Sequence, residues 1–165
     1  MDNMSKEIER KFLINEMPNL NKICTGDYEM PYTYAHIEQY YLNYAPEIRI
    51  RKHNNMHSIT YKSDGDLIRE ELESNISRET FENLKQKAKT CIKKTRYYVP
   101  ADKYFLEIDD YDDLDLITVE IEFIDEESAQ NFKPFDWFGK EVTYDKQYKN
   151  KNLARYGLNG CGNYE

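Results

Sequence analysis

The stretch Glu7-Ile8-Glu9-Arg10-Lys11, near the start of the chain, decides the fold. Successive side chains of a β-strand point to opposite faces, so Glu7, Glu9 and Lys11 share one face while Ile8 faces the other way. A single strand of this kind has an ordinary explanation, in which the polar face is wet and the apolar face packs on a core. The stretch becomes informative because the same arrangement recurs along the chain.

The composition indicates one folded domain. A chain of 165 residues is long enough for a single domain with a real core. Charged residues make up 33% of it and hydrophobic residues 39%, which alone would favour disorder. However, the 15 Tyr and 7 Phe bury large areas and favour strands. We therefore expect residues 1–156 to form one domain and residues 157–165 a flexible tail.

Charge and cysteine content exclude several classes of function. The net charge of −8 argues against a sequence-independent nucleic-acid binder. Cys24, Cys91 and Cys161 are far apart, odd in number and without metal-ligand spacing, so they are expected to be free thiols in a reducing compartment. No apolar run approaches the length of a bilayer. The sequence predicts a cytoplasmic protein that is not bound to a membrane, and it leaves the oligomeric state open.

Short segments of alternating hydrophobicity, separated by turn residues, predict a mainly β protein of the α+β class. The predicted strands cover residues 5–14, 34–42, 47–52, 58–62, 67–76, 92–99, 104–109, 116–123 and 141–144. Helices are predicted over 78–89 with Ser77 as N-cap, over 126–132, and from Asp145 to about Arg155. Hairpin links imply an antiparallel sheet, and closure into a barrel would remove its edges.

The charged faces of these strands are sorted by sign. The basic positions are Lys11, Arg49, Arg51, Lys62, Arg69, Lys94 and Arg96. The acidic positions are Glu7, Glu9, Glu71, Glu73, Asp109, Glu120 and Glu122. Arginine suits bidentate phosphate contact, and carboxylates on facing strands suit hard cations such as Mg²⁺ or Mn²⁺. The positive charges of the basic set equal the negative charges of the acidic set, so the empty face has no net charge. Divalent metal bound at the acidic positions would make it positive and therefore attractive to a polyphosphate.

The order of these motifs resembles that of the CYTH superfamily, also called triphosphate tunnel metalloenzymes. The opening EIERK fits an ExExK signature and is followed by QYYL (39–42), RIR (49–51), TYK (60–62), the R-x-E-x-E run at 69–73, KTRY (94–97), EID (107–109), EIE (120–122) and EVTYDKQYKNKNL (141–153). The resemblance covers nearly the whole chain. It is strongest to the short bacterial branch that hydrolyses inorganic triphosphate.

The resemblance implies an eight-stranded antiparallel β-barrel that forms an open tunnel, with a few outer helices. The implied catalytic residues are Glu7, Glu9, Lys11, Glu120 and Glu122. The implied metal ligands are Glu7, Glu9, Glu120 and Glu122, completed by Glu71, Glu73 and Asp109 as ligands or as holders of metal-bound water. The implied phosphate-binding residues are Lys11, Arg49, Arg51, Lys62, Lys94 and Arg96. Arg69 belongs to that set or pairs with the glutamates of its own strand.

The implied chemistry uses two Mg²⁺ or Mn²⁺ ions, one at the phosphate oxygens and one at the attacking water. The expected reaction is hydrolysis of inorganic triphosphate to pyrophosphate and phosphate. Open alternatives are a class IV-type adenylate cyclase, a nucleoside or thiamine triphosphatase, and a non-catalytic polyphosphate-binding module. No base pocket is evident, because Trp137 is expected to join an aromatic cluster, and this favours the smaller substrate. The full set of carboxylates favours metal chemistry over binding alone.

Overall fold

The computed structural model describes residues 8–24, 32–64 and 70–158. Its strands are β1 (Ile8–Ile14), β2 (Thr33–Tyr44), β3 (Glu47–His53), β4 (Met56–Lys62), β5 (Glu71–Asn75), β6 (Thr90–Ala101), β7 (Tyr104–Tyr111) and β8 (Ile117–Phe123). They form one eight-stranded sheet in the order β1-β8-β7-β6-β2-β3-β4-β5. The predicted eight-stranded antiparallel sheet with few helices is confirmed, and β1 and β5 stand at the two ends of the order.

The helices are short. They are α1 (Leu20–Ile23), α2 (Arg78–Lys85), α3 (Glu126–Asn131), the 3₁₀ turn η1 (Lys146–Tyr148) and α4 (Asn150–Tyr156). α1 was not anticipated from the sequence, whereas α2 and α3 were. The described chain contains no helix that is both long and apolar enough to span a membrane.

The segment after α3 departs from the prediction. The predicted strand over 141–144 is wrong, because Glu141 makes only an isolated bridge to Phe12. The helix predicted from Asp145 to about Arg155 is divided in two: the 3₁₀ turn η1 begins directly after Asp145, and α4 begins after Lys149. The physical cause is that the segment meets β1 through scattered bonds that do not continue as a regular ladder.

One of these hydrogen bonds explains why residue 139 is a glycine. The N–H of Gly139 donates to the Leu13 carbonyl at 2.7 Å. A Cβ atom at position 139 would lie 2.7 Å from that same oxygen, which is closer than a carbon atom can approach an oxygen to which it is not bonded. Glycine therefore allows the segment to lie directly against the β1 backbone.

The chain folds into two compact units that alternate along the sequence. As far as the chain is described, the first unit contains residues 36–93 and 146–158, and the second contains residues 8–35 and 94–145. The single domain predicted over 1–156 stays a prediction. The tail predicted over 157–165 lies almost wholly outside the described residues.

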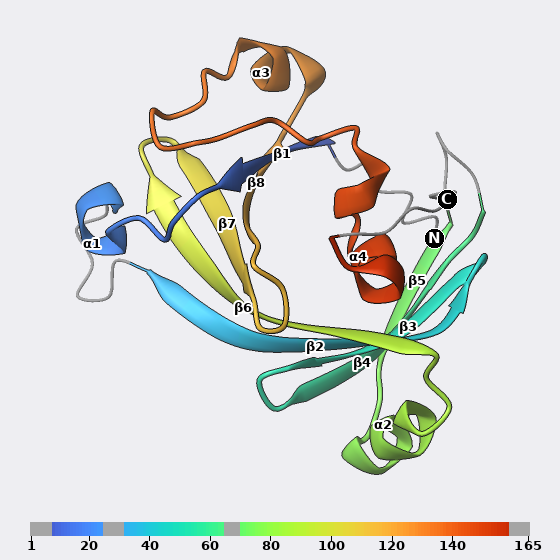
Figure 1. Cartoon of the computed structure of the whole chain (residues 1–165). Helices are drawn as coiled ribbons and strands as arrows, with labels where there is room; N and C mark the ends of the chain where they lie inside the picture. Colours follow the sequence, from blue (N-terminus) through green and yellow to red (C-terminus); the bar gives the residue numbers. More distant parts are fainter. Residues whose placement is uncertain (1–7, 25–31, 65–69, 159–165) are drawn as a thin grey trace. The chain divides into compact units, whose positions relative to one another are not determined.

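The core of the first unit lies between α2 and the strands beside it. Phe81 of α2 is fully buried and packs with Tyr40 and Ile50. Figure 1 shows α2 beside β3 and β4. The helix begins where the sequence predicted, because the Ser77 hydroxyl accepts the backbone N–H of Thr80 at 3.0 Å.

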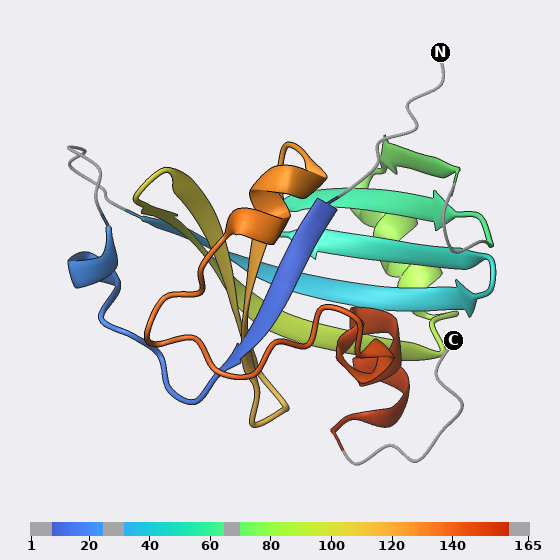
Figure 2. The same cartoon turned by 90° about the horizontal axis from the view of Figure 1, so that it is seen from above.

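The second unit has a core of its own, formed by the apolar faces of β1, β7 and β8. Phe12, Leu106, Ile108 and Val119 are at most 1% exposed. α3 lies beside β1 and β8, as both views show (Figures 1 and 2). The aromatic cluster predicted around Trp137 is confirmed, with the Trp137 ring stacked on a neighbouring phenylalanine.

Arg10 ties the chain after α3 to β1. Its Nε and Nη2 donate to the Glu141 carboxylate at 2.9 and 2.7 Å, and its Nη1 donates to the carbonyls of Ala129 and Phe132 at 2.8 and 3.0 Å.

Arg10→Ala is expected to lower the free energy of unfolding by about 2–3 kcal/mol, because two carbonyls lose their donor. Urea denaturation measures this loss. The exposed Arg78→Ala should change it by less than about 0.5 kcal/mol, and an equal loss in both variants would contradict the assignment.

Candidate active site

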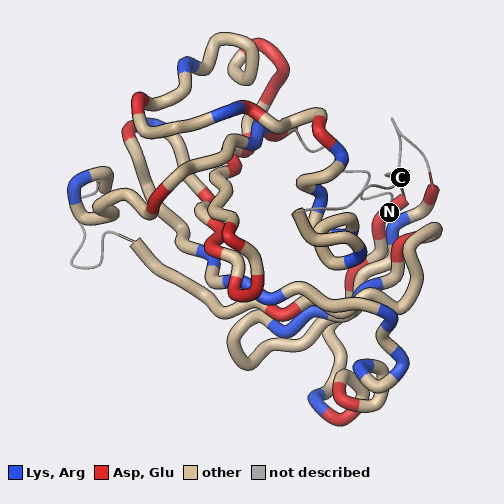
Figure 3. Tube along the Cα trace, viewed as in Figure 1, with Lys and Arg blue, Asp and Glu red and all other residues tan. Residues whose placement is uncertain are grey.

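The second unit places a row of glutamates on one face of its strands. The antiparallel register sets Glu9 of β1 opposite Glu122 of β8, and Glu120 of β8 opposite Glu107 of β7. Directly opposed residues share a face, with Cβ atoms roughly 4.5–5.5 Å apart. Figure 3 shows acidic and basic positions gathered where β6, β7 and β8 run side by side. The strands thus bring two carboxylate pairs to one face.

The row is electrostatically suited to cations. Burial raises the pKa of Glu107, and the negative charge of Glu120 adds to that effect against the attraction of Arg96. Lys11, opposite Glu120 in the register, lies 3.4 Å from its carboxylate. Like charges opposed on neighbouring strands are destabilising unless a cation lies between or beside them.

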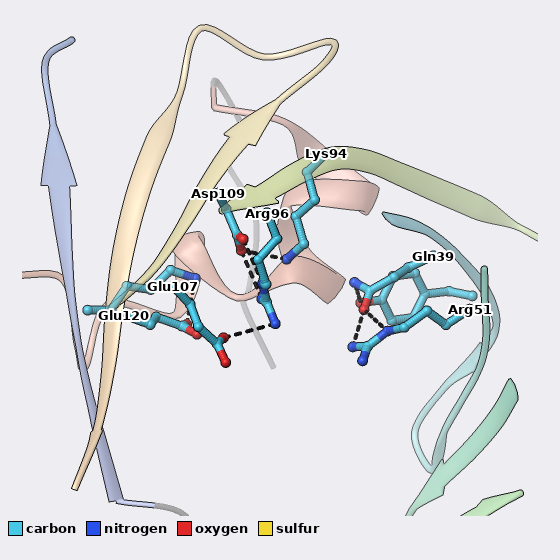
Figure 4. Close-up of polar contacts among 9 residues, drawn as sticks. Gln39, Arg51, Lys94, Arg96, Glu107, Asp109 and Glu120 are labelled. Carbon is cyan, nitrogen blue, oxygen red and sulfur yellow. Dashed lines mark hydrogen bonds and ion pairs between the residues drawn. The ribbon is translucent and has the colours of Figure 1, made fainter. Parts of the chain in front are cut away.

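A buried ion cluster adjoins this row. Asp109 is 2% exposed, and its Oδ2 accepts from Lys94 Nζ at 2.7 Å. Arg96 donates to the same carboxylate in bidentate fashion, from Nε to Oδ1 at 2.7 Å and from Nη2 to Oδ2 at 2.9 Å. Figure 4 shows the Asp109 carboxylate joined to both cations. Bidentate charge-assisted bonds fix orientation as well as energy, so Asp109 sets where both cations point.

The pKa shifts in this cluster follow from burial and charge. Burial lowers the pKa of Lys94 to about 8, although Asp109 opposes the change. Burial alone would raise the pKa of Asp109, but the charges and hydrogen bonds of Lys94 and Arg96 outweigh it and hold that pKa well below its usual range. Near neutral pH the cluster therefore consists of one carboxylate and two cations, with a net positive charge.

Arg96 joins the ion cluster to the glutamate row. Its Nη1 lies 2.9 Å from a carboxylate oxygen of Glu107, which is opposite Glu120. The guanidinium thus contacts Asp109 on one side and Glu107 on the other (Figure 4). Carboxylates and cations alternate on this face of the second unit, as expected of a surface that binds a metal ion and an anion together.

The first unit carries a second charged face, which includes two arginines of β3. Arg49 and Arg51 of β3 are set opposite Tyr41 and Gln39 of β2, and opposite Thr60 and Ser58 of β4. Arg49 Nη1 lies 3.3 Å from the Glu47 carboxylate. These cations share one face of the strands, as the period of two predicted.

Two of the predicted acidic positions lie in this first unit. Glu71 of β5 is opposite Lys62 of β4, and their charged atoms are 3.9 Å apart. Glu73 is opposite Thr60. Glu71 thus contacts a lysine, whereas the glutamates of the second unit are set against one another.

Two predicted positions, Glu7 and Arg69, lie outside the described residues. The structure also identifies site residues that were not among the predicted ones. Glu107 was not among the candidates, although it shares a face with Asp109 two residues later, and that alternation was the available signal. Gln39 belongs to the QYYL motif (39–42), but it was given no role because an uncharged side chain does not stand out in a charge pattern. Its fully buried amide contacts Arg51.

A divalent metal fits the donor chemistry of the glutamate row. Within the described residues, no group of three or more His, Cys, Asp or Glu side chains could enclose an ion. Mg²⁺ is usually held by only one or two carboxylates, with waters and substrate phosphates as its other ligands. The pairs Glu9–Glu122 and Glu107–Glu120 supply carboxylate oxygens, which suit Mg²⁺ or Mn²⁺ rather than softer metals.

The fold and these faces define a class of protein in which an eight-stranded antiparallel sheet carries carboxylates and cations on shared faces. The chain belongs to the CYTH family, whose domain matches residues 5–155. It is 38% identical over 157 residues to the inorganic triphosphatase of Nitrosomonas europaea, covering 90% of this chain and 96% of the relative. It is 32% identical over 159 residues to the inorganic triphosphatase of Acetivibrio thermocellus, covering 92% and 95%.

Solved structures of other proteins are similar to this chain in fold. A crystal structure of an inorganic triphosphatase superposes with a TM-score of 0.71 at 34% identity, covering 96% of this chain and 99% of that one. A protein from Pyrococcus horikoshii has a TM-score of 0.53 at 22% identity, covering 76% of this chain and 82% of that one. The second similarity extends to the fold alone.

Proposed function

We propose that this chain is a divalent-metal-dependent hydrolase that cleaves inorganic triphosphate to pyrophosphate and phosphate. The observation that carries the proposal is the glutamate row of the second unit, in which Glu9 faces Glu122 and Glu107 faces Glu120, beside the cations Lys11 and Arg96. The relatives named inorganic triphosphatase support it, since they match over nearly all of their length.

In this proposal Glu9, Glu107, Glu120 and Glu122 hold the metal. A bound divalent ion would supply charge neutralisation at the phosphate oxygens and a lowered pKa for a bound water. The four glutamates lie on neighbouring strands in a fixed register, which keeps their carboxylates on one face. Two ions, and Mg²⁺ or Mn²⁺ as their identity, remain part of the proposal.

We assign Asp109 to positioning the cations. Its two oxygens already accept three hydrogen bonds from Lys94 and Arg96. Metal binding at Asp109 would have to compete with both cations, so holding them is the better supported role. Lys11, Lys94 and Arg96 are proposed to contact phosphate oxygens, where their charge offsets that of the substrate.

The other predicted residues enter the proposal on the strength of the sequence resemblance. Arg49, Arg51, Lys62 and Arg69 are proposed to bind substrate phosphates, and Glu7, Glu71 and Glu73 to complete the acidic set. A cytoplasmic location is likewise a proposal.

The experiment that tests the function is phosphate release by purified protein with Mg²⁺, Mn²⁺ or EDTA. Inorganic triphosphate, ATP and thiamine triphosphate would be compared, with cyclic AMP assayed in parallel. We expect fast release from inorganic triphosphate that EDTA abolishes, and much slower release from the other two. Cyclic AMP formation from ATP would replace the proposal with the cyclase reaction, and binding without turnover would replace it with a binding module.

A further inference from the structure

Gln39 of β2 is a fully buried amide in contact with one of the arginines of the first unit. It is 0% exposed and lies opposite Arg51 in the register. Its Oε1 accepts from Arg51 Nε at 2.8 Å and also from Arg51 Nη2 (Figure 4). One amide oxygen thus accepts two of the five N–H bonds of the guanidinium. Because the guanidinium is planar, these two bonds to its Nε and Nη2 edge fix the orientation of the whole group.

A second buried side chain holds Gln39 in this position. Gln39 Nε2 lies 3.5 Å from the hydroxyl oxygen of Tyr41, which is also 0% exposed. Burial raises the pKa of Tyr41 to about 12, so its hydroxyl stays neutral across the physiological range. The Gln39 amide that contacts Arg51 and the Tyr41 phenol beside that amide are therefore both uncharged. Both side chains are fully buried.

The two structural units hold their arginines in different ways. Arg96 uses its Nε and Nη2 edge to bind the Asp109 carboxylate, whereas Arg51 uses the same edge to bind the Gln39 amide. The first partner contributes a negative charge and the second contributes none. Glutamate at this position would accept the same two bonds from Arg51, but it would add a negative charge and lose the amide N–H that contacts Tyr41.

We propose that Gln39 is a positioning residue for the anionic substrate, which orients the Arg51 guanidinium for phosphate contact without cancelling its charge. The inference rests on the proposed function, because it assigns Arg51 to phosphate binding. The physical reason is that a neutral acceptor orients the arginine but does not itself offset its positive charge, so the attraction between Arg51 and a highly charged anion is stronger than it would be with a carboxylate at position 39.

The test compares Gln39→Glu, Gln39→Leu and the exposed control Gln130→Glu, which adds the same charge on α3. Inorganic triphosphate is titrated into metal-free protein in EDTA, so that binding is measured without turnover. Absence of measurable binding by the wild type would overturn the inference, because Arg51 would then not hold the anion by its own charge. We expect Gln39→Glu to weaken binding about tenfold at low salt and less at high salt, because the new charge is screened. Gln130→Glu should bind as the wild type does. Gln39→Leu should weaken binding with little salt dependence and should also lower stability, because the guanidinium edge loses its acceptor.

A double-mutant cycle with Arg51→Ala separates positioning from a purely structural role. If Gln39 acts through Arg51, the uncharged Gln39→Leu should have little further effect on binding once Arg51 is removed. Additive losses from Gln39→Leu and Arg51→Ala, or wild-type binding by Gln39→Leu while Arg51 is present, would overturn the inference. Steady-state kinetics with Mg²⁺ should show Gln39→Glu raising KM more than it lowers kcat. Absence of hydrolysis by the wild type would defeat the proposed function instead, while the binding cycle would still decide the role of Gln39.

Discussion

Glu122→Gln and Glu9→Gln are each expected to lower kcat/KM for inorganic triphosphate by about 100-fold or more, because each removes one carboxylate from a pair proposed to hold metal. The two residues face each other across β8 and β1, so either change leaves a single carboxylate in the pair. Glutamine is nearly the same size as glutamate, and the fold should survive the change. Steady-state hydrolysis, with circular dichroism to monitor folding, measures the effect.

A metal titration distinguishes this explanation from general damage. Weakened metal binding should shift the half-maximal Mg²⁺ or Mn²⁺ concentration upward, so that added metal restores part of the activity. The matched control is Glu82→Gln on the exposed face of α2, which should behave as the wild type. Wild-type activity in Glu9→Gln or Glu122→Gln would show that these residues do not hold the metal.

Asp109→Asn is expected to have the largest effect on stability, lowering the free energy of unfolding by about 3–5 kcal/mol. The change removes the charge that Lys94 and Arg96 share, while both remain buried or nearly so. A buried cation without its counter-ion is costly unless it loses its proton, and Lys94 is the one that can. Chemical denaturation at pH 7 measures the loss, and triphosphate hydrolysis should fall with it because neither cation keeps its orientation.

The same variant makes a prediction about pH. The pKa of Asp109 is lower in the folded protein than in the unfolded chain, so its contribution to stability is complete above the unfolded value of about 3.9 and is lost as pH falls through the folded value. Wild type and Asp109→Asn should therefore differ most above about pH 5 and converge in stronger acid. The exposed Asp113→Asn should match the wild type throughout. A stability difference that stays constant from pH 7 into strong acid would show that the charge of Asp109 is not the cause.

Much of the fold could be predicted because strand alternation is written directly in the residue order. The stretch around Glu9 and Lys11 predicted which side chains share a face, and the register of β1 with β8 agrees. The N-cap at Ser77 was also predictable, since a local hydrogen bond decides where a helix begins. The segment around Glu141 was not, because its conformation depends on distant contacts with β1 and Arg10.

The charge pattern identified charged residues, but it could not tell how they pair. Asp109 and Glu107 share one face of β7, yet the first is fully engaged by two cations and the second contacts Arg96 while facing Glu120. That difference depends on how deeply each residue is buried and on which strand lies opposite. Gln39 shows the same limit, because its importance lies in its lack of charge and in a contact with a neighbouring strand.

The most direct test of the account is a ³¹P NMR time course of inorganic triphosphate with purified protein and Mg²⁺ or Mn²⁺. The account predicts that the triphosphate signals disappear while pyrophosphate and phosphate accumulate in equal amounts, and that EDTA stops the reaction. Unchanged triphosphate with either metal, at a protein concentration where binding is complete, would contradict the central claim that these charged strands form a triphosphate hydrolase.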